Sequence, residues 1–175
     1  MQRVFRIGLA VLGVALLACG VAMAQDIRTQ AMPGIDFSKY HTYKWVRVEG
    51  AEYPNQIMDA EIKQAVDAQL ATKGLSKVEN DPADLYISYQ TAVQQSKQWN
   101  AYGTGGFRWG GGMASATQST INTGTLVLDF YDPTTKTLVW TGSATKTLNP
   151  SSNQEKNVKN LNSAMAKLLK NYPPK

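Results

Sequence analysis

The chain has very few of the residues that most often carry catalysis or bind metals. Cys19 is the only cysteine and His41 the only histidine among 175 residues. Cys19 lies in an N-terminal apolar segment, so a protein cleaved after it would have no disulfide, thiol nucleophile or cysteine-bound metal. Its stability would then depend on its hydrophobic core. A Ser-His-Asp triad would need His41 as its base, and no GxSxG motif supplies a nucleophile.

Metal binding and carboxylate chemistry have little more support. A metal site usually combines several His, Cys or carboxylate ligands, so we interpret His41 as a partly exposed strand residue. Asp129 and Asp132 are the candidate pair for carboxylate catalysis. Their spacing of three places them on opposite faces of a strand. We expect Asp132 to cap a turn, and Asp129 to form a hydrogen bond or to pair with a lysine on the exposed face. We assign no catalytic residue, metal ligand or cofactor.

Charge is sparse and of mixed sign. Charged residues make up 18% of the chain and hydrophobic residues 43%, which indicates a globular protein rather than a disordered one. The net charge of +5 falls by two if Arg3 and Arg6 leave with a leader. The lysines are scattered rather than clustered, which argues against a nucleic-acid partner.

The one long apolar run lies at the N-terminus and predicts a secretory signal peptide over residues 1–24. Arg3 and Arg6 precede the run at residues 7–18, and small alanines occupy the positions that a signal peptidase reads, so cleavage is expected after Ala24. The run is short for a membrane span of about 20 residues. We therefore predict a periplasmic protein of residues 25–175.

A second processing route remains open. The segment 16–19 resembles a bacterial lipobox, in which Cys19 would be lipidated and become the first residue. Leu17 is larger than the residue usual at its position, whereas the alanine motif downstream fits the other route. Lipidation would make the protein an outer-membrane-anchored lipoprotein that touches the membrane only through its lipid.

The clearest structural pattern is a predicted β-hairpin over residues 124–145. Leu126, Leu128 and Phe130 alternate with residues of the opposite face, and so do Leu138 and Trp140 in the second run. Alternation on both sides of a turn at 132–136 indicates an antiparallel pair with one buried face.

Similar patterns divide the rest of residues 25–175 into one domain. We expect further strands near 26–31, 42–48, 75–78 and 84–95. Helices are expected over 57–73, between Asn55 as N-cap and Gly74 as C-cap, and from about 153 to Tyr172. The order β-β-α-β-β-β-β-α predicts an α+β two-layer sandwich, with a mainly antiparallel sheet of about six strands and two helices packed on one face.

A segment rich in glycine and aromatic residues lies between two of the predicted strands, near residues 97–118. Loops longer than about 12–15 residues are usually functional or disordered. The candidate binding residues in this segment are Trp99, Tyr102, Phe107, Arg108 and Trp109. Aromatic rings beside an arginine are suited to stacking on a sugar or holding an anionic group. A phosphate loop is excluded because no Gly-Lys-Ser or Gly-Lys-Thr follows the glycines.

Several motifs together resemble a bacterial envelope family known only as a domain of unknown function, number forty-one thirty-six. They are Asp36-Phe37-x-x-Tyr40-x-Thr42-Tyr43-x-Trp45, Leu70-Ala71-x-Lys73-Gly74, Pro82-Ala83-Asp84-Leu85-x-Ile87-x-Tyr89, and the hairpin ending at Leu138-Val139-Trp140-x-Gly142. No single motif is specific, but their order and spacing cover nearly the whole chain after the leader. The resemblance implies an exported protein, often a lipoprotein, and implies no activity.

The sequence thus favours a non-enzymatic exported cell-envelope protein that binds an envelope protein or glycan through the segment near 97–118 or through an exposed strand edge. One alternative is a hydrolase that acts on the cell wall or on lipids with carboxylates of the sheet. The other is a carrier that holds a small apolar ligand between sheet and helices.

Overall fold

The computed structural model describes residues 25–102, 115–148 and 153–174, and of 98–102 and 115–119 only the backbone. The predicted leader and Cys19 lie outside the described residues. The elements follow the predicted order: β1 (Asp26–Ala31), the short 3-10 helix η1 (Phe37–Lys39), β2 (Thr42–Trp45), α1 (Gln56–Thr72), β3 (Ser76–Lys77), β4 (Leu85–Tyr102), β5 (Ser115–Asp132), β6 (Thr137–Leu148) and α2 (Gln154–Leu168).

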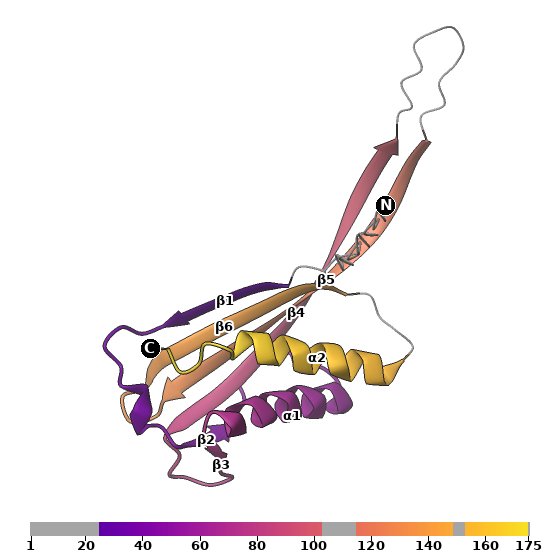
Figure 1. Ribbon diagram of the computed structural model, residues 1–175. Helices are drawn as coiled ribbons and strands as arrows, with labels where there is room; N and C mark the ends of the chain where they lie inside the picture. The colour runs from indigo at the N-terminus through magenta and orange to yellow at the C-terminus, as the bar shows by residue number, and fades with distance from the viewer. Residues whose placement is uncertain (1–24, 103–114, 149–152, 175) are drawn as a thin grey trace, which may run out of the picture.

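The fold is the predicted two-layer α+β sandwich. Its six strands have the order β1-β6-β5-β4-β2-β3, and both helices cover the same face of the sheet (Figure 1). Strands β1, β6, β5 and β4 are antiparallel to their neighbours. Strand β2 is parallel to both β3 and β4. Helix α1 returns the chain to the end of the sheet at which β2 begins, so the strands that follow run in the same direction as β2. The sheet is therefore mixed, although mainly antiparallel.

Helix α1 begins and ends where local sequence signals place it. The Asn55 side chain accepts a hydrogen bond from the Met58 backbone N–H at 3.0 Å, as an N-cap does. Gly74 has φ +85° and the Leu75 N–H donates to the Leu70 carbonyl at 3.1 Å, which closes the C-terminus. The buried stripe of the helix contains Ile62, Ala65, Val66 and Leu70.

The core lies between the two helices and the sheet. Met165 and Leu168 of α2 are buried in it, as is Tyr172 just after the helix. The Phe130 ring lies 4.8 Å from Trp140 and 4.9 Å from Tyr172 between ring centroids. Such tilted and edge-on aromatic contacts add to the area that the rings bury.

The predicted hairpin is present as β5 and β6, but one of its assignments is wrong. Leu138 was expected to share the buried face with Trp140, whereas it is 36% exposed and Val139 is fully buried instead. Tyr131 pairs with Leu138 and Phe130 pairs with Trp140, so Val139 is an extra residue in β6. This β-bulge interrupts the alternation and rotates Leu138 away from the core.

Gly142 leaves the space that the Trp140 and Leu168 side chains fill. A Cβ atom at Gly142 would lie 2.5 Å from Trp140 Cη2 and 2.9 Å from Leu168 Cδ1. Both neighbours belong to the buried core, so neither has open solvent to move into. The close approach of α2 to β6 therefore depends on the missing side chain at this position.

We expect Gly142→Ala to lower the free energy of unfolding by about 1–3 kcal/mol, because overpacking a filled core costs about that much. Urea unfolding measures the change. Ser143→Ala is the matched control: the residue is next in β6 and only partly buried, and its unfolding curve should stay close to that of the unmodified protein. Equal stability of Gly142→Ala and the unmodified protein would contradict this packing.

Candidate binding site

Strand β4 continues well beyond the end near residue 95 that the sequence pattern indicates. It pairs with β5 without interruption from Tyr86 opposite Tyr131 to Tyr102 opposite Ser115. Trp99 and Tyr102 therefore lie in the strand, and only their backbone is described. Phe107, Arg108 and Trp109 lie outside the described residues. Cross-strand hydrogen bonding, rather than apolar alternation, extends this strand through polar sequence.

The paired ends of β4 and β5 project beyond the helices and the other strands (Figure 1). Strand β6 ends at Leu148, which pairs with Asn122, and Asn122 in turn pairs with Gln95. Beyond that row the described sheet has only two strands. We call the part of β4 and β5 from residue 92 to 102 and from 115 to 125 the ribbon. Its first rows, at 122–125, still pair with β6, and the rest is two-stranded.

The described side chains of the ribbon are exposed or half-buried, and its sequence is nearly uncharged. All residues from Ala92 to Lys97 are exposed, and Val93 is 69% exposed. Lys97 is the one charged residue of either strand segment. The Gln95 side-chain amide donates to the Asn122 side-chain oxygen at 3.2 Å across the strands. The ribbon thus offers amide, hydroxyl and small apolar groups rather than charge.

The outer edge of β4 is also open. The Val46 N–H donates to the Ile87 carbonyl at 2.8 Å, so the backbone groups of Ile87 face β2. Backbone groups alternate in direction along a strand, and those of Thr91, Val93 and Gln95 therefore point the same way as those of Ile87. Strand β2 pairs only with the first residues of β4, and no other described strand lies on this side.

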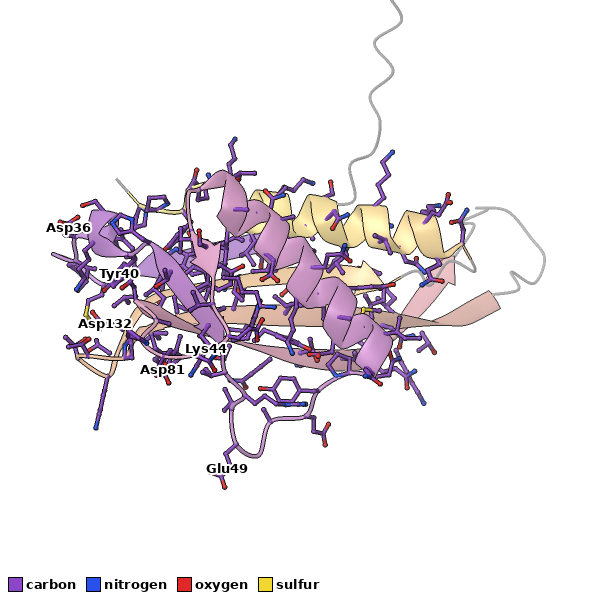
Figure 2. The ribbon with its side chains drawn as sticks, turned by 90° about the horizontal axis from the view of Figure 1, so that it is seen from below. Asp36, Tyr40, Lys44, Glu49, Asp81 and Asp132 are labelled. Atoms are coloured by element: carbon purple, nitrogen blue, oxygen red, sulfur yellow. The ribbon has the colours of Figure 1, made fainter. Side chains whose placement is uncertain are left out.

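Asp132 is the most heavily bonded carboxylate and caps the β5–β6 turn as predicted. It accepts hydrogen bonds from the backbone N–H groups of Thr134 at 2.9 Å and Thr135 at 3.2 Å. Lys39 Nζ and the Tyr40 hydroxyl each donate to it at 3.0 Å. Figure 2 shows Tyr40 and Asp132 at the same end of the sheet. Burial raises the pKa of Asp132, but these donors together lower it to about 2.

Asp129 has a separate environment. It is 8% exposed and accepts a hydrogen bond of 2.6 Å from the Thr141 hydroxyl on β6. The expected hydrogen bond is present, but the expected position on the exposed face is wrong, because the carboxylate is buried beside Thr141 of the neighbouring strand. Asp129 and Asp132 are therefore engaged by different donors, and both serve to join strands or close a turn.

Two further carboxylates join α1 to the sheet, and sequence reasoning missed both. Asp67 accepts hydrogen bonds from the Tyr43 hydroxyl at 2.7 Å and from Trp45 Nε1 at 2.8 Å. Asp59 accepts from the Tyr89 hydroxyl at 2.5 Å and from Lys63 at 2.9 Å. The spacing of these two acids beside the apolar stripe of α1 is the sequence signal that could have indicated that they face the sheet. That spacing does not identify the aromatic residues that donate to them.

His41 lies just before β2 in the described part of the chain. His41 is exposed there, and its backbone N–H donates to Asp84 at 2.9 Å. Within residues 25–102, 115–148 and 153–174, no group of three or more His, Cys, Asp or Glu side chains is placed to hold a metal ion. No helix in these ranges has the length and apolar character needed to cross a bilayer.

Comparison with known proteins identifies a family and a fold. The model of a family described as a domain of unknown function, DUF4136, matches residues 27–174. None of the curated proteins matches the chain. A PDZ domain protein from Parabacteroides distasonis ATCC 8503 is 15% identical, with a TM-score of 0.55 over 86% of this chain and 36% of that one. The chain thus spans little more than a third of that protein, and the likeness supports the fold alone.

A second solved structure is similar over most of both chains. The PelC dodecamer from Paraburkholderia phytofirmans is 14% identical to this chain, with a TM-score of 0.49. The match covers 83% of this chain and 95% of that one. Its similarity is weaker than that of the PDZ domain protein, and it contributes nothing to the argument about function.

Removing the charge of Asp132 should make the stability of the protein less dependent on pH. The lowered pKa means that Asp132 stabilises the fold above its unfolded pKa of about 3.9, and that this stability, about 2 kcal/mol, is lost as the pH falls toward 2. Asp132→Asn should therefore destabilise the protein at neutral pH and flatten its stability between neutral and acidic pH.

Urea unfolding over that pH range measures both effects. Asp26→Asn is the control, because both side chains of its ion pair with Arg28 are exposed and such pairs contribute about 0–1 kcal/mol. The same loss of stability on acidification in Asp132→Asn and in the unmodified protein would show that Asp132 does not act through its charge.

Proposed function

Because the chain belongs to the DUF4136 family of domains of unknown function, whose name specifies no activity, we propose a role from the structure. The protein is an exported, non-enzymatic binding protein of the cell envelope. It engages an envelope protein or glycan through the projecting ribbon of β4 and β5. The observation that supports this proposal is the ribbon itself, which extends past the helices and the other described strands (Figure 1).

A projecting two-stranded ribbon is difficult to explain by stability alone. Two strands without a packed face are marginally stable in water, and they leave an open edge that natural proteins usually protect. The residues of β5 that precede Leu126 are mostly polar or glycine, so they add no continuous apolar face there. The projection is better explained as a structure that is completed when a partner binds.

The composition of the ribbon limits the chemistry of recognition. Lys97 is its one charged residue, whereas the two-layer body has several ion pairs. Recognition would therefore use hydrogen bonds from backbone, amide and hydroxyl groups, together with contacts to exposed apolar atoms such as those of Val93. A neutral glycan or an uncharged extended peptide fits these groups, and binding should depend little on salt because few charges take part.

The location in the envelope is part of the proposal and is supported by the predicted leader at residues 1–24. Cleavage after Ala24 would release the protein into the periplasm. Lipidation of Cys19 would instead hold it at the outer membrane. Either route places the ribbon in a compartment that contains glycans and the extended segments of other envelope proteins.

Shortening the ribbon in register tests the proposal. Ser96 and Ile121 face each other across the strands, and Ser96 is one of the even-numbered residues whose backbone groups bond to β5. An Asn-Gly dipeptide that joins them therefore replaces residues 97–120 and closes a two-residue hairpin. We expect in-cell crosslinking to capture an envelope partner with the intact protein and to lose it with the shortened one. The melting temperature should change little, because the helices, β1, β2 and β6 are unaltered.

Gln64→Ala, an exposed substitution on α1, provides the matched control and should capture the same partner as the intact protein. The same partner captured equally by the shortened protein would overturn the role of the ribbon. The enzymatic alternative has its own test: a folded Asp129→Asn protein that loses a measured turnover on cell-wall or lipid substrate would overturn the non-enzymatic assignment.

A further inference from the structure

We propose that the outer edge of β4 pairs with the same edge of a second copy of this chain, forming a symmetric antiparallel dimer. The pairing extends from Thr91 to Trp99, with the two-fold axis at Gln95. It goes beyond the envelope partner proposed above and does not rest on it, because it uses one edge of the ribbon and leaves both faces accessible.

The backbone direction makes this edge available. Ile87 directs its backbone groups toward β2, and the ladder between β4 and β5 is continuous. Odd-numbered residues of β4 therefore present their N–H and C=O groups outward, whereas even-numbered residues bond to β5. Beyond Trp45 and Val46, no described strand covers the outward groups.

The edge lacks the devices that usually prevent strand pairing. Natural edge strands are protected by proline, β-bulges, charged side chains or short length. From Ser88 to Tyr102, β4 contains no proline and one charged residue, Lys97. Its pairing with β5 shows no register shift, and the strand is 18 residues long. The edge is therefore open to pairing along most of the ribbon.

A second copy is the occupant that these features fit. It supplies an edge of the same length, with the same low charge and the same unpaired backbone N–H and C=O groups. An axis at Gln95 places one glutamine opposite the other, with Val93 opposite Lys97 of the second copy, so the two lysines do not meet. Antiparallel pairing also turns each ribbon into part of a four-stranded sheet, which is more stable than a two-stranded one.

Electrostatic repulsion does not oppose this arrangement. The chain has a net charge of +5, and charged residues are concentrated in the body rather than in the ribbon. In the dimer the bodies lie at opposite ends of the paired strands, and the two Ile87 residues are about 50 Å apart at a rise of about 3.4 Å per residue. This separation is several times the Debye length of about 8 Å at physiological salt.

The mass of the purified full-length protein, measured by sedimentation over a range of concentrations without any partner, tests the proposal. We expect a dimer, and we expect Gln95→Pro to weaken it at least tenfold. Proline removes an outward N–H that β5 does not use, so the fold is retained, and edge strands tolerate proline at such positions. Gln95→Ala keeps the N–H and should dimerise like the unmodified protein.

Two substitutions that leave the backbone intact test the register. In Val93→Lys, the new lysine of each copy would lie opposite Lys97 of the other copy, which gives two like-charged pairs in the dimer. Like charges directly opposite each other repel, so this substitution should weaken the dimer several-fold. Val93→Glu would face the same lysine and should strengthen the dimer. Val93 is exposed, so neither change should disturb the fold.

Three results would overturn the inference: a monomer at every concentration, a dimer unaffected by Gln95→Pro, or equal effects of Val93→Lys and Val93→Glu. These measurements use the isolated protein, so they are independent of the envelope partner. Capture of that partner by a monomeric Gln95→Pro protein would support the proposed function and show that binding does not require the dimer. A protein that dimerises but captures no partner would support the dimer and overturn the proposed function.

Discussion

The antiparallel ladder between β4 and β5 is the interaction on which the rest of the structure depends. It is continuous from Tyr86 to Tyr102 on β4, and the other strands add to its two sides. Strand β6 and then β1 follow β5, while β2 and β3 follow the first residues of β4. The helices cover one face at one end only (Figure 1). One pair of strands therefore forms both the centre of the core and the projecting ribbon.

A set of carboxylates holds the layers around this ladder. Asp59 and Asp67 join α1 to aromatic side chains of the sheet, while Asp84 accepts hydrogen bonds from the His41 and Thr42 backbone. Asp132 joins η1 to the β5–β6 turn. Each carboxylate accepts at least one donor from an element distant in sequence. A partly buried charge with its hydrogen bonds satisfied fixes the relative position of its elements, and its removal leaves those donors unpaired.

The body and the ribbon differ in the chemistry that they offer. The body has a filled core and a surface with ion pairs, and its buried carboxylates, Asp129 and Asp132, have structural partners. The ribbon has one charged residue, a run of exposed side chains from Ala92 to Lys97 and an open backbone edge. This contrast is the physical basis for assigning recognition to the ribbon, for the envelope partner through its exposed groups and for the second copy through the edge of β4.

Local signals in the sequence determined the helices, the β5–β6 hairpin and the two-layer arrangement. Asn55 and Gly74 set the ends of α1, and Asp132 capped the turn between β5 and β6. Apolar spacing indicated the buried faces. Each of these effects acts within a few residues. The order of the short motifs likewise indicated the family.

Only the tertiary structure decided what depends on distant pairing. The bulge at Val139 exposed Leu138, α1 placed β2 parallel to β4, and pairing with β5 carried β4 to Tyr102 through a polar segment. The donors to Asp59, Asp67 and Asp132 also come from elements that chain order alone does not bring together. Hydrogen bonding between strands does not require apolar alternation, and therefore leaves little trace in the periodicity of either strand.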